Sequence, residues 1–266
     1  MSNIFRDNLL RDQVAFVTGG GSGIGRRIAE RFAEHGAKVV LVGRKPQKLA
    51  DTAAAICVAG GVAAVEPLDV REYEDLAAAL KRSYDRFGDI GILVCAAAGN
   101  FPAPVTGMSD HGFKAVIDID LLGTFNTCRA AYPHLRKPGA SILAISANHA
   151  TMPIAFQSHV CAAKAGVELL TKTLALEWGP AGIRANCITP GPTDDTEGMS
   201  RLAPTLEARR AVERNVPLGR LGTKDELADL ALFLCSEAAA YITGAVYLCD
   251  GGTSLGRAGF LPAPPR

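Results

Sequence analysis

Short runs of apolar residues recur along the chain, and longer stretches with a helical period of apolar and polar residues separate them. The short runs are nearly continuous in apolar residues, as is typical of parallel strands that helices cover on both faces. Seven strands are therefore expected, at residues 14–18, 38–42, 62–66, 90–95, 141–146, 183–188 and 245–248.

The longer stretches repeat apolar residues at spacings of three and four, which is the period of an amphipathic helix. Strand and helix alternate, and this alternation predicts right-handed crossovers and a doubly wound sheet. The expected fold class is α/β: a single Rossmann-like domain over residues 1–266, with a seven-stranded parallel sheet and helices on both faces. The helices are expected near residues 23–35, 45–59, 71–87, 109–136, 158–178 and 223–236.

Two segments interrupt the alternation. Residues 190–216 combine prolines with mixed charge, and we expect a long loop with a small helix that covers a site as a substrate lid. The tail at residues 253–266 is rich in Gly and Pro, so we expect it to form no element and to fray or pack on a neighbouring subunit. No linker divides the chain, and a second domain is not expected.

The composition narrows the classes of protein. The 266 residues carry 28 Lys and Arg against 27 Asp and Glu, a net charge of +1, so no basic field exists to attract a nucleic acid. The N-terminal stretch has no uninterrupted apolar run, so neither a signal peptide nor a membrane span is expected. The seven cysteines are widely spaced and never form C-x-x-C, which favours core packing over disulfides or a metal site. The C-terminal Ala-Pro-Pro-Arg is no peroxisomal address, so a cytoplasmic location is expected.

A glycine-rich turn follows the first expected strand. Residues 19–25 read Gly-Gly-Gly-Ser-Gly-Ile-Gly and lead into a helix with Ile28, Ala29 and Phe32 on one side. Glycines let a backbone approach a pyrophosphate closely, and the N–H groups at a helix start attract its charge. The order of strand, turn and helix therefore predicts a dinucleotide site, with an ordinary flexible turn as the alternative.

The end of the second expected strand indicates which dinucleotide binds. An NAD-binding fold normally places Asp or Glu there, whereas this chain has Arg44 followed by Lys45. Cations pair with a 2′-phosphate, which a carboxylate would repel. NADP(H) is therefore the predicted cofactor, and the alternative is a solvated basic turn.

The glycine-rich turn and three further motifs together resemble those of the short-chain dehydrogenase/reductase family, and the resemblance covers nearly the whole chain. These motifs are Leu68-Asp69-Val70, Pro190-Gly191-Pro192 and Asp250-Gly251-Gly252. In that family the first contacts adenine and the second lies beside the nicotinamide. The resemblance implies a cofactor site made of Gly19, Ser22, Gly23, Ile24, Gly25, Arg44, Lys45, Asp69, Val70, Ala97, Gly99, Lys164, Pro190, Gly191 and Thr193.

The catalytic positions depart from the family pattern. The family usually performs alcohol and ketone chemistry with an Asn, a Ser and a Tyr-x-x-x-Lys set. Lys164 is present, but Val160 stands at the tyrosine position and Ala147 at the serine position, with Ser146 beside it as a candidate substitute. Ordinary carbonyl reduction therefore lacks its proton donor.

One branch of the superfamily tolerates these losses, namely the 2,4-dienoyl-CoA reductases, and the sequence is similar to the peroxisomal type and its bacterial relatives. In that branch an Asp and the Lys are the implied catalytic pair, which map onto Asp120 and Lys164. Dienoyl reduction spreads the negative charge into a dienolate that is finally protonated on carbon, so a phenol is unnecessary. The matching positions are residues 97–101, 117–120, 123–126, His159 and 191–198.

Helical geometry separates two aspartates on the helix that usually offers Asn. Asp118 lies four residues after Lys114 and predicts a surface ion pair, whereas Asp120 interrupts an apolar stripe that includes Val116. A carboxylate that faces the core needs a partner, so Asp120 is either catalytic or a structural hydrogen-bonding group. Lys164 also lies on an apolar face. The family implies that it holds the nicotinamide ribose and supports Asp120, and a snorkelling side chain is the alternative.

Several further residues are candidates for contact with an acyl-CoA substrate. His149 lies close to where the mitochondrial dienoyl-CoA reductases place a tyrosine, and there it would donate to the thioester oxygen; a loop histidine facing solvent is the alternative. Asn100 and Phe101 follow the fourth expected strand, where a role in the turn competes with substrate binding.

The main hypothesis is an NADPH-dependent reductase of 2,4-dienoyl-CoA or related enoyl thioesters. One alternative is a ketoreductase that uses His149 or Ser146 as its proton donor. The other is an NADP(H)-binding protein without turnover. Family analogy implies a homotetramer.

Overall fold

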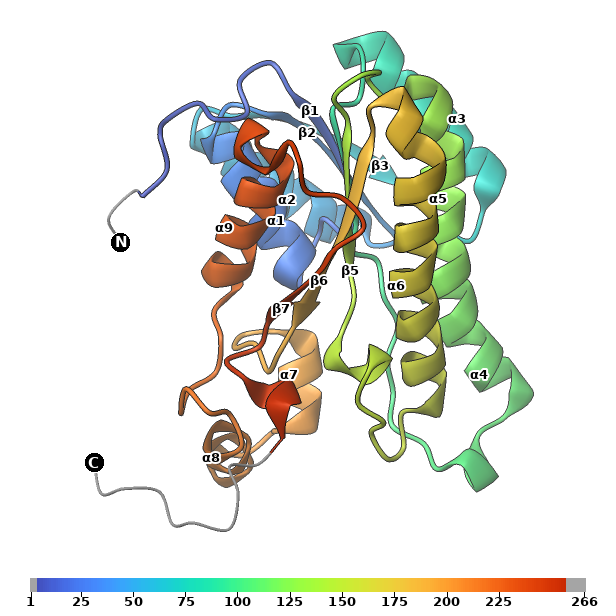
Figure 1. Ribbon diagram of the computed structural model, residues 1–266, viewed down its shortest axis with the longest axis vertical. Helices are drawn as coiled ribbons and strands as arrows, with labels where there is room; N and C mark the ends of the chain where they lie inside the picture. Colours follow the sequence, from blue (N-terminus) through green and yellow to red (C-terminus); the bar gives the residue numbers. More distant parts are fainter. Residues whose placement is uncertain (1–3, 257–266) are drawn as a thin grey trace.

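The structure, a computed structural model, describes residues 4–256 and contains the predicted seven-stranded parallel sheet (Figure 1). The strands are β1 (Val14–Thr18), β2 (Lys38–Gly43), β3 (Val62–Pro67), β4 (Ile92–Cys95), β5 (Ser141–Ile145), β6 (Arg184–Pro190) and β7 (Val246–Cys249). They pair in parallel in the order β3-β2-β1-β4-β5-β6-β7. The order reverses between β1 and β4, and open α/β sheets bind ligands at such a switch point.

Helices cover both faces of the sheet (Figure 1). One face carries α1 (Gly23–Glu34), α2 (Pro46–Val58) and α9 (Lys224–Cys235). The other carries α3 (Tyr73–Phe87), α5 (Gly123–Ala131) and α6 (Ser158–Trp178), and α4 (Asp110–Val116) leads toward α5. This arrangement leaves the carboxyl ends of the strands open to a site.

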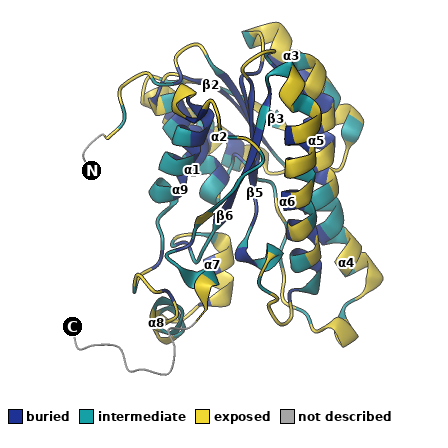
Figure 2. Ribbon diagram, in the orientation of Figure 1, coloured by how far each residue is buried: buried dark blue, intermediate teal, exposed yellow. Residues whose placement is uncertain are grey.

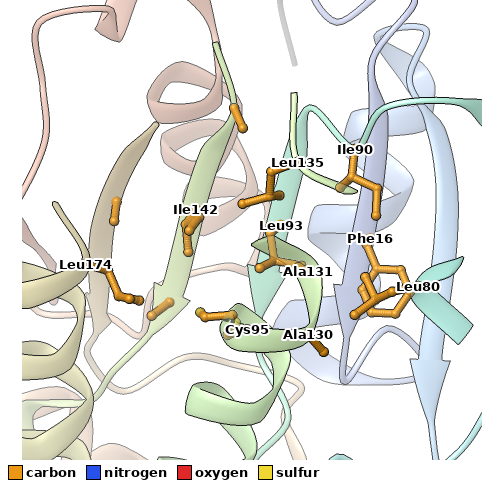
Figure 3. Close-up of a cluster of buried hydrophobic side chains, with 14 of the residues drawn as sticks. Phe16, Leu80, Ile90, Leu93, Cys95, Ala130, Ala131, Leu135, Ile142 and Leu174 are labelled. Atoms are coloured by element: carbon orange, nitrogen blue, oxygen red, sulfur yellow. Dashed lines mark hydrogen bonds between the residues drawn. The ribbon is translucent and has the colours of Figure 1, made fainter. Parts of the chain in front are cut away.

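Apolar side chains form a separate core layer on each face of the sheet. In β1 all five residues are buried, and alternate side chains point to opposite faces. Phe16 therefore packs with Leu80 of α3 and Leu93 of β4 (Figure 3), whereas Val17 packs in the layer with Phe32 of α1. Figure 2 shows the central strands among the most deeply buried parts of the fold. Burial on both faces explains why the central strands β1, β4 and β5 read as continuous apolar runs, whereas the edge strands β3 and β7 are partly exposed.

The long helix expected at residues 109–136 is present as an unbroken helical stretch over residues 110–134, but it is not a regular α-helix throughout. After α4, a π-helical segment occupies Ile117–Leu122, α5 follows directly, and Tyr132–His134 forms a 3₁₀ turn. A π-helical segment changes the hydrogen-bonding step from four residues to five, and such segments occur often at functional sites. This one contains Asp120.

The lid region has two helices where one was expected: α7 (Glu197–Leu202) and α8 (Leu206–Arg214). Both lie beyond the carboxyl ends of the strands (Figure 1). The expectation for the tail is wrong at its start, because Thr253–Leu255 forms a 3₁₀ turn, and residues 257–266 lie outside the described part of the chain. Within residues 4–256, no helix is both long and apolar enough to cross a bilayer.

Candidate active site

The glycine-rich turn between β1 and α1 forms one wall of a cavity of about 590 Å³. Gly19 has a φ of +71°, and a Cβ there would lie 2.5 Å from the carbonyl oxygen of Ala96; a Cβ on Gly25 would lie 2.6 Å from the carbonyl oxygen of Gly19. Side chains are thus excluded, and the backbone itself forms the wall. Ser22 precedes α1 without bonding its side chain to the helix, and Ser22 and Gly23 line the cavity. The N–H groups of the first turn fit a pyrophosphate.

Thr18 joins the glycine-rich turn to the end of β4. Its hydroxyl oxygen accepts hydrogen bonds from the N–H groups of Ala96 (3.1 Å) and Ala97 (3.3 Å), and the hydroxyl donates to the carbonyl of Val94 at 3.3 Å. Because β1 and β4 flank the switch point, these bonds hold both walls of the cavity in register.

Cations line the other end of the cavity. Arg44 and Lys45 follow β2, and the Arg44 side chain is 57% exposed. Asp69 lies 3.9 Å from the Arg44 guanidinium, but Arg71 binds this carboxylate at 2.7 Å and lowers its pKa. An exposed guanidinium beside an already paired carboxylate is available to a phosphate. The glycine wall and these cations together fit a phosphorylated dinucleotide.

Asp120 and Lys164, the pair that the resemblance implied, form a buried ion pair beyond the carboxyl ends of β4 and β5. Nζ of Lys164 lies 3.1 Å from Oδ2 of Asp120, and the two residues are 6% and 1% exposed. The N–H of Gly99 donates to Oδ1 of Asp120 at 2.7 Å, and Lys164 also donates to the carbonyl of Ile145 at 3.0 Å. No described group donates an aligned hydrogen bond to Oδ2 of Asp120. Oδ2 of Asp120 is buried, and its contact within the described chain is the ammonium group of Lys164.

The tyrosine position holds Val160, which is buried against Val116. Among the described residues, the cavity walls include no tyrosine. Asp118 forms the predicted surface ion pair with Lys114. The site therefore differs from a Tyr-x-x-x-Lys site in its geometry as well as in its sequence.

Two histidines lie near the buried ion pair. His149 lines the cavity; burial lowers its pKa, and the positive charge of Lys164 lowers it further. Asn100 also lines the cavity, whereas Phe101 does not and packs its ring 4.6 Å from that of His159, measured between ring centres. Burial likewise lowers the pKa of His159, which is fully buried. Both imidazoles are thus held toward the neutral form.

Ser146 lines the cavity, but its hydroxyl is engaged in the core. It donates to Oε1 of Glu168 at 2.7 Å, and Ser146 is only 2% exposed. The expectation that Ser146 offers its hydroxyl to a substrate, or replaces the missing serine, does not agree with this geometry.

The cavity brings together most of the predicted cofactor residues. Gly99 does not line it and acts instead through its hydrogen bond to Asp120. The described residues contain no cluster of three or more His, Cys, Asp or Glu that could hold a metal. The predicted residues that line the cavity are Gly19, Ser22, Gly23, Ile24, Gly25, Arg44, Lys45, Asp69, Val70, Ala97, Asn100, Ser146, His149, Lys164, Pro190, Gly191 and Thr193.

Sequence reasoning missed several residues of the cavity. Met199, Leu202 and Val212 reach it from the two lid helices, and only their apolar character within a polar segment could have indicated this. Lys48 lines the cationic end and pairs with Glu197 of α7 at 2.5 Å. The lid therefore contacts the cavity at both its apolar and its cationic parts.

Comparison with known proteins identifies the family. The family profile described as Enoyl-(Acyl carrier protein) reductase matches residues 19–254. The peroxisomal 2,4-dienoyl-CoA reductase of Danio rerio, named as (3E)-enoyl-CoA-producing, is 42% identical over 256 residues, covering 96% of this chain and 85% of that protein. A probable 2,4-dienoyl-CoA reductase of Bacillus subtilis, named as (2E)-enoyl-CoA-producing, is 40% identical over 246 residues, covering 91% and 97%.

Solved structures show the same fold. A gluconate 5-dehydrogenase from Burkholderia cenocepacia, in complex with NADP and tartrate, superimposes with a TM-score of 0.88 at 30% identity, covering 94% of this chain and 99% of that one. The chain belongs to the short-chain dehydrogenase/reductase family and is an oxidoreductase. Within that family it is similar to the 2,4-dienoyl-CoA reductases.

Proposed function

We propose that this protein uses NADPH to reduce 2,4-dienoyl-CoA or a related enoyl thioester. The observation that carries the proposal is the buried ion pair of Asp120 and Lys164 beside a cavity whose described walls include no tyrosine. Ketone reduction requires an acid that protonates an alkoxide, whereas dienoyl reduction ends with protonation of carbon. The names of the Danio rerio and Bacillus subtilis relatives support this choice.

Different residues of the cavity would bind different parts of the cofactor and the substrate. The glycine wall and the start of α1 would hold the pyrophosphate, and Arg44 with Lys45 would bind the 2′-phosphate, which favours NADP(H) over NAD(H). Bound NADPH would supply the hydride. The apolar lid residues Met199 and Leu202 would cover the acyl chain.

His149 would stabilise the charge that develops on the substrate. Hydride addition at the end of the diene moves negative charge onto the thioester oxygen, and a hydrogen-bond donor placed there lowers the barrier. The lowered pKa of His149 keeps its ring neutral at pH 7, and a neutral imidazole still carries one N–H donor.

Asp120 and Lys164 would deliver the proton. Lys164 balances the charge of the carboxylate and lines the cavity. Nζ of Lys164 would hold a water in the cavity, and the buried carboxylate of Asp120, which does not itself line the cavity, would hold that ammonium group in place. This water would give a proton to the dienolate carbon while it takes one from the ammonium group of Lys164, which solvent water then reprotonates, so no phenol is needed.

The test is an assay of the purified protein with NADPH and 2,4-hexadienoyl-CoA. We expect turnover, and we expect Asp120→Ala to lower kcat by about 10²-fold, the effect of losing a positioned proton-transfer group. Asp118→Ala is the matched control, because Asp118 lies two residues away in the same π-helical segment and pairs with Lys114 on the surface. Its kcat should stay within about twofold of wild type.

The products and the failures are equally informative. Protonation at the α-carbon predicts a (3E)-enoyl product by NMR, and a (2E) product would place the proton donor at the other end of the dienolate. Robust ketone reduction without dienoyl turnover would identify a ketoreductase. NADPH binding without turnover on any acyl thioester would identify a binding protein.

A further inference from the structure

Glu168 is a buried carboxylate that the proposed chemistry does not use. It lies on α6 one turn after Lys164, so the two side chains project from the same face of the helix. Each residue is only 6% exposed. A carboxylate is costly to bury unless hydrogen bonds satisfy it.

Two hydroxyl groups from neighbouring strands satisfy Glu168. Its Oε1 accepts from Oγ of Ser146 at 2.7 Å and from Oγ1 of Thr189 at 3.0 Å. Ser146 directly follows β5, and Thr189 immediately precedes Pro190 at the end of β6. One carboxylate oxygen therefore joins the ends of two adjacent strands to α6.

Both strand ends belong to the cofactor cavity. Ser146 itself lines it, and so do Pro190 and Gly191, which follow Thr189. A displacement of either strand end would move the wall that the family places beside the nicotinamide.

The same strand end also holds Lys164. Nζ of Lys164 donates to the carbonyl of Ile145 at 3.0 Å, and Ile145 is bonded to Ser146 in the chain. Two side chains of opposite charge, one helical turn apart, thus hold the last residue of β5 and the residue that follows it. The position of Lys164 relative to Asp120 depends on this contact.

We propose that Glu168 is a positioning residue, which fixes the ends of β5 and β6 against α6 so that Lys164 and the cofactor wall keep their geometry. The role of Lys164 rests on the proposed function. The binding of NADPH does not depend on which substrate the protein reduces, so it provides a separate readout.

The experiment compares Glu168→Ala with Glu168→Gln. Glutamine keeps an oxygen that accepts both hydroxyls, whereas alanine removes the acceptor. We expect Glu168→Ala to raise the Kd for NADPH about tenfold and to lower kcat at saturating substrates about tenfold, because misplacing a binding group by a fraction of an ångström is costly. Glu168→Gln should keep both the Kd for NADPH and kcat within about threefold of the wild-type values. Glu177→Gln is the control, because Glu177 is an exposed residue of α6.

Thr189→Val provides a second test if Glu168→Ala does not fold, since valine has nearly the shape of threonine and lacks the hydroxyl. It should raise the Kd for NADPH about threefold and lower kcat, for the loss of one of the two hydrogen bonds. A folded Glu168→Ala or Thr189→Val protein with wild-type Kd and kcat, and only a lower Tm, would overturn the proposal. A wild-type protein that does not reduce dienoyl-CoA overturns the proposed function instead, and the Kd series then decides the role of Glu168.

Discussion

At the scale of single residues, Arg44 determines the predicted choice between NADPH and NADH. Its guanidinium is exposed at the cationic end of the cavity, and Asp69 beside it is already bound by Arg71. We expect Arg44→Ala to raise the KM for NADPH about tenfold, because a charge-assisted contact to the 2′-phosphate is lost. Steady-state kinetics with both cofactors measure this effect.

NADH serves as the internal control for Arg44→Ala, because it has no 2′-phosphate. Its KM should change by less than about twofold. An equal loss with both cofactors would show that Arg44 supports the fold of the turn and not the phosphate.

Single residues were predictable where the helical period alone decides their environment. Asp120 interrupts an apolar stripe and Lys164 lies between valines, so the burial of each side chain follows from the spacing along its own helix. Ser146 and Glu168 were not predictable in this way, because their hydrogen bond joins positions 22 residues apart on different elements. A contact of this kind depends on how α6 is placed over the sheet, which no local pattern encodes.

At the scale of elements, the start of α9 carries a pH-dependent cap. The side chain of Thr223 accepts from the N–H of Glu226 at 3.2 Å, and Glu226 accepts from the N–H of Thr223 at 2.8 Å. Arg220 binds Glu226 at 2.6 Å and is the main cause that lowers the pKa of Glu226 from 4.5 to about 2. Because the pKa of Glu226 is lower in the folded state, the ionised carboxylate stabilises the folded protein above pH 4.5. This stabilisation is lost as the pH falls toward 2.

The Glu226→Gln protein should therefore be less stable than wild type at pH 7 by under about 1 kcal/mol, because the Glu226 side chain is 42% exposed and solvent screens its ion pair. This difference in the free energy of unfolding between the two proteins should shrink as the pH falls from 5 to 3. Urea unfolding at pH 7, 5 and 3 measures it. Glu237→Gln changes an exposed glutamate just after α9 and should leave the pH dependence of wild type intact. A stability difference of equal size at pH 7 and pH 3 would contradict a stabilising role for the charge of Glu226.

Most elements were predictable, and the exceptions have physical causes. The central strands β1, β4 and β5 are buried on both faces, so their apolar runs are continuous and their positions are clear. The π-helical segment Ile117–Leu122 was read as regular helix, because a change of hydrogen-bonding step leaves the apolar period almost unchanged over six residues. The second lid helix, α8, is only nine residues long, and its apolar side consists of Ala208, Ala211 and Val212, which is too short a stripe to separate a helix from the surrounding loop.

At the scale of the whole molecule, the outer side of the α5 and α6 layer is apolar in places. Phe125 of α5 is 41% exposed, and Leu169 and Leu176 of α6 are 66% and 80% exposed. Leu169 and Leu176 are seven residues apart, which places them on one side of the helix. Figure 2 shows exposed surface along the outer sides of both helices. Apolar side chains gathered on one face favour a contact between copies of the chain.

We expect this contact to help build the homotetramer that family analogy implies, with a mass of about 111 kDa, four times the chain mass of 27.8 kDa. Light scattering after size-exclusion chromatography measures this mass. The double variant Leu169→Glu and Leu176→Glu should give a smaller assembly, because charges that face each other across an apolar contact would remain unpaired. Val58→Glu is the control, since Val58 is 90% exposed at the end of α2 on the opposite face of the sheet. If the double variant keeps the wild-type mass, the contact lies elsewhere, and a wild-type mass of one chain would refute the assembly itself.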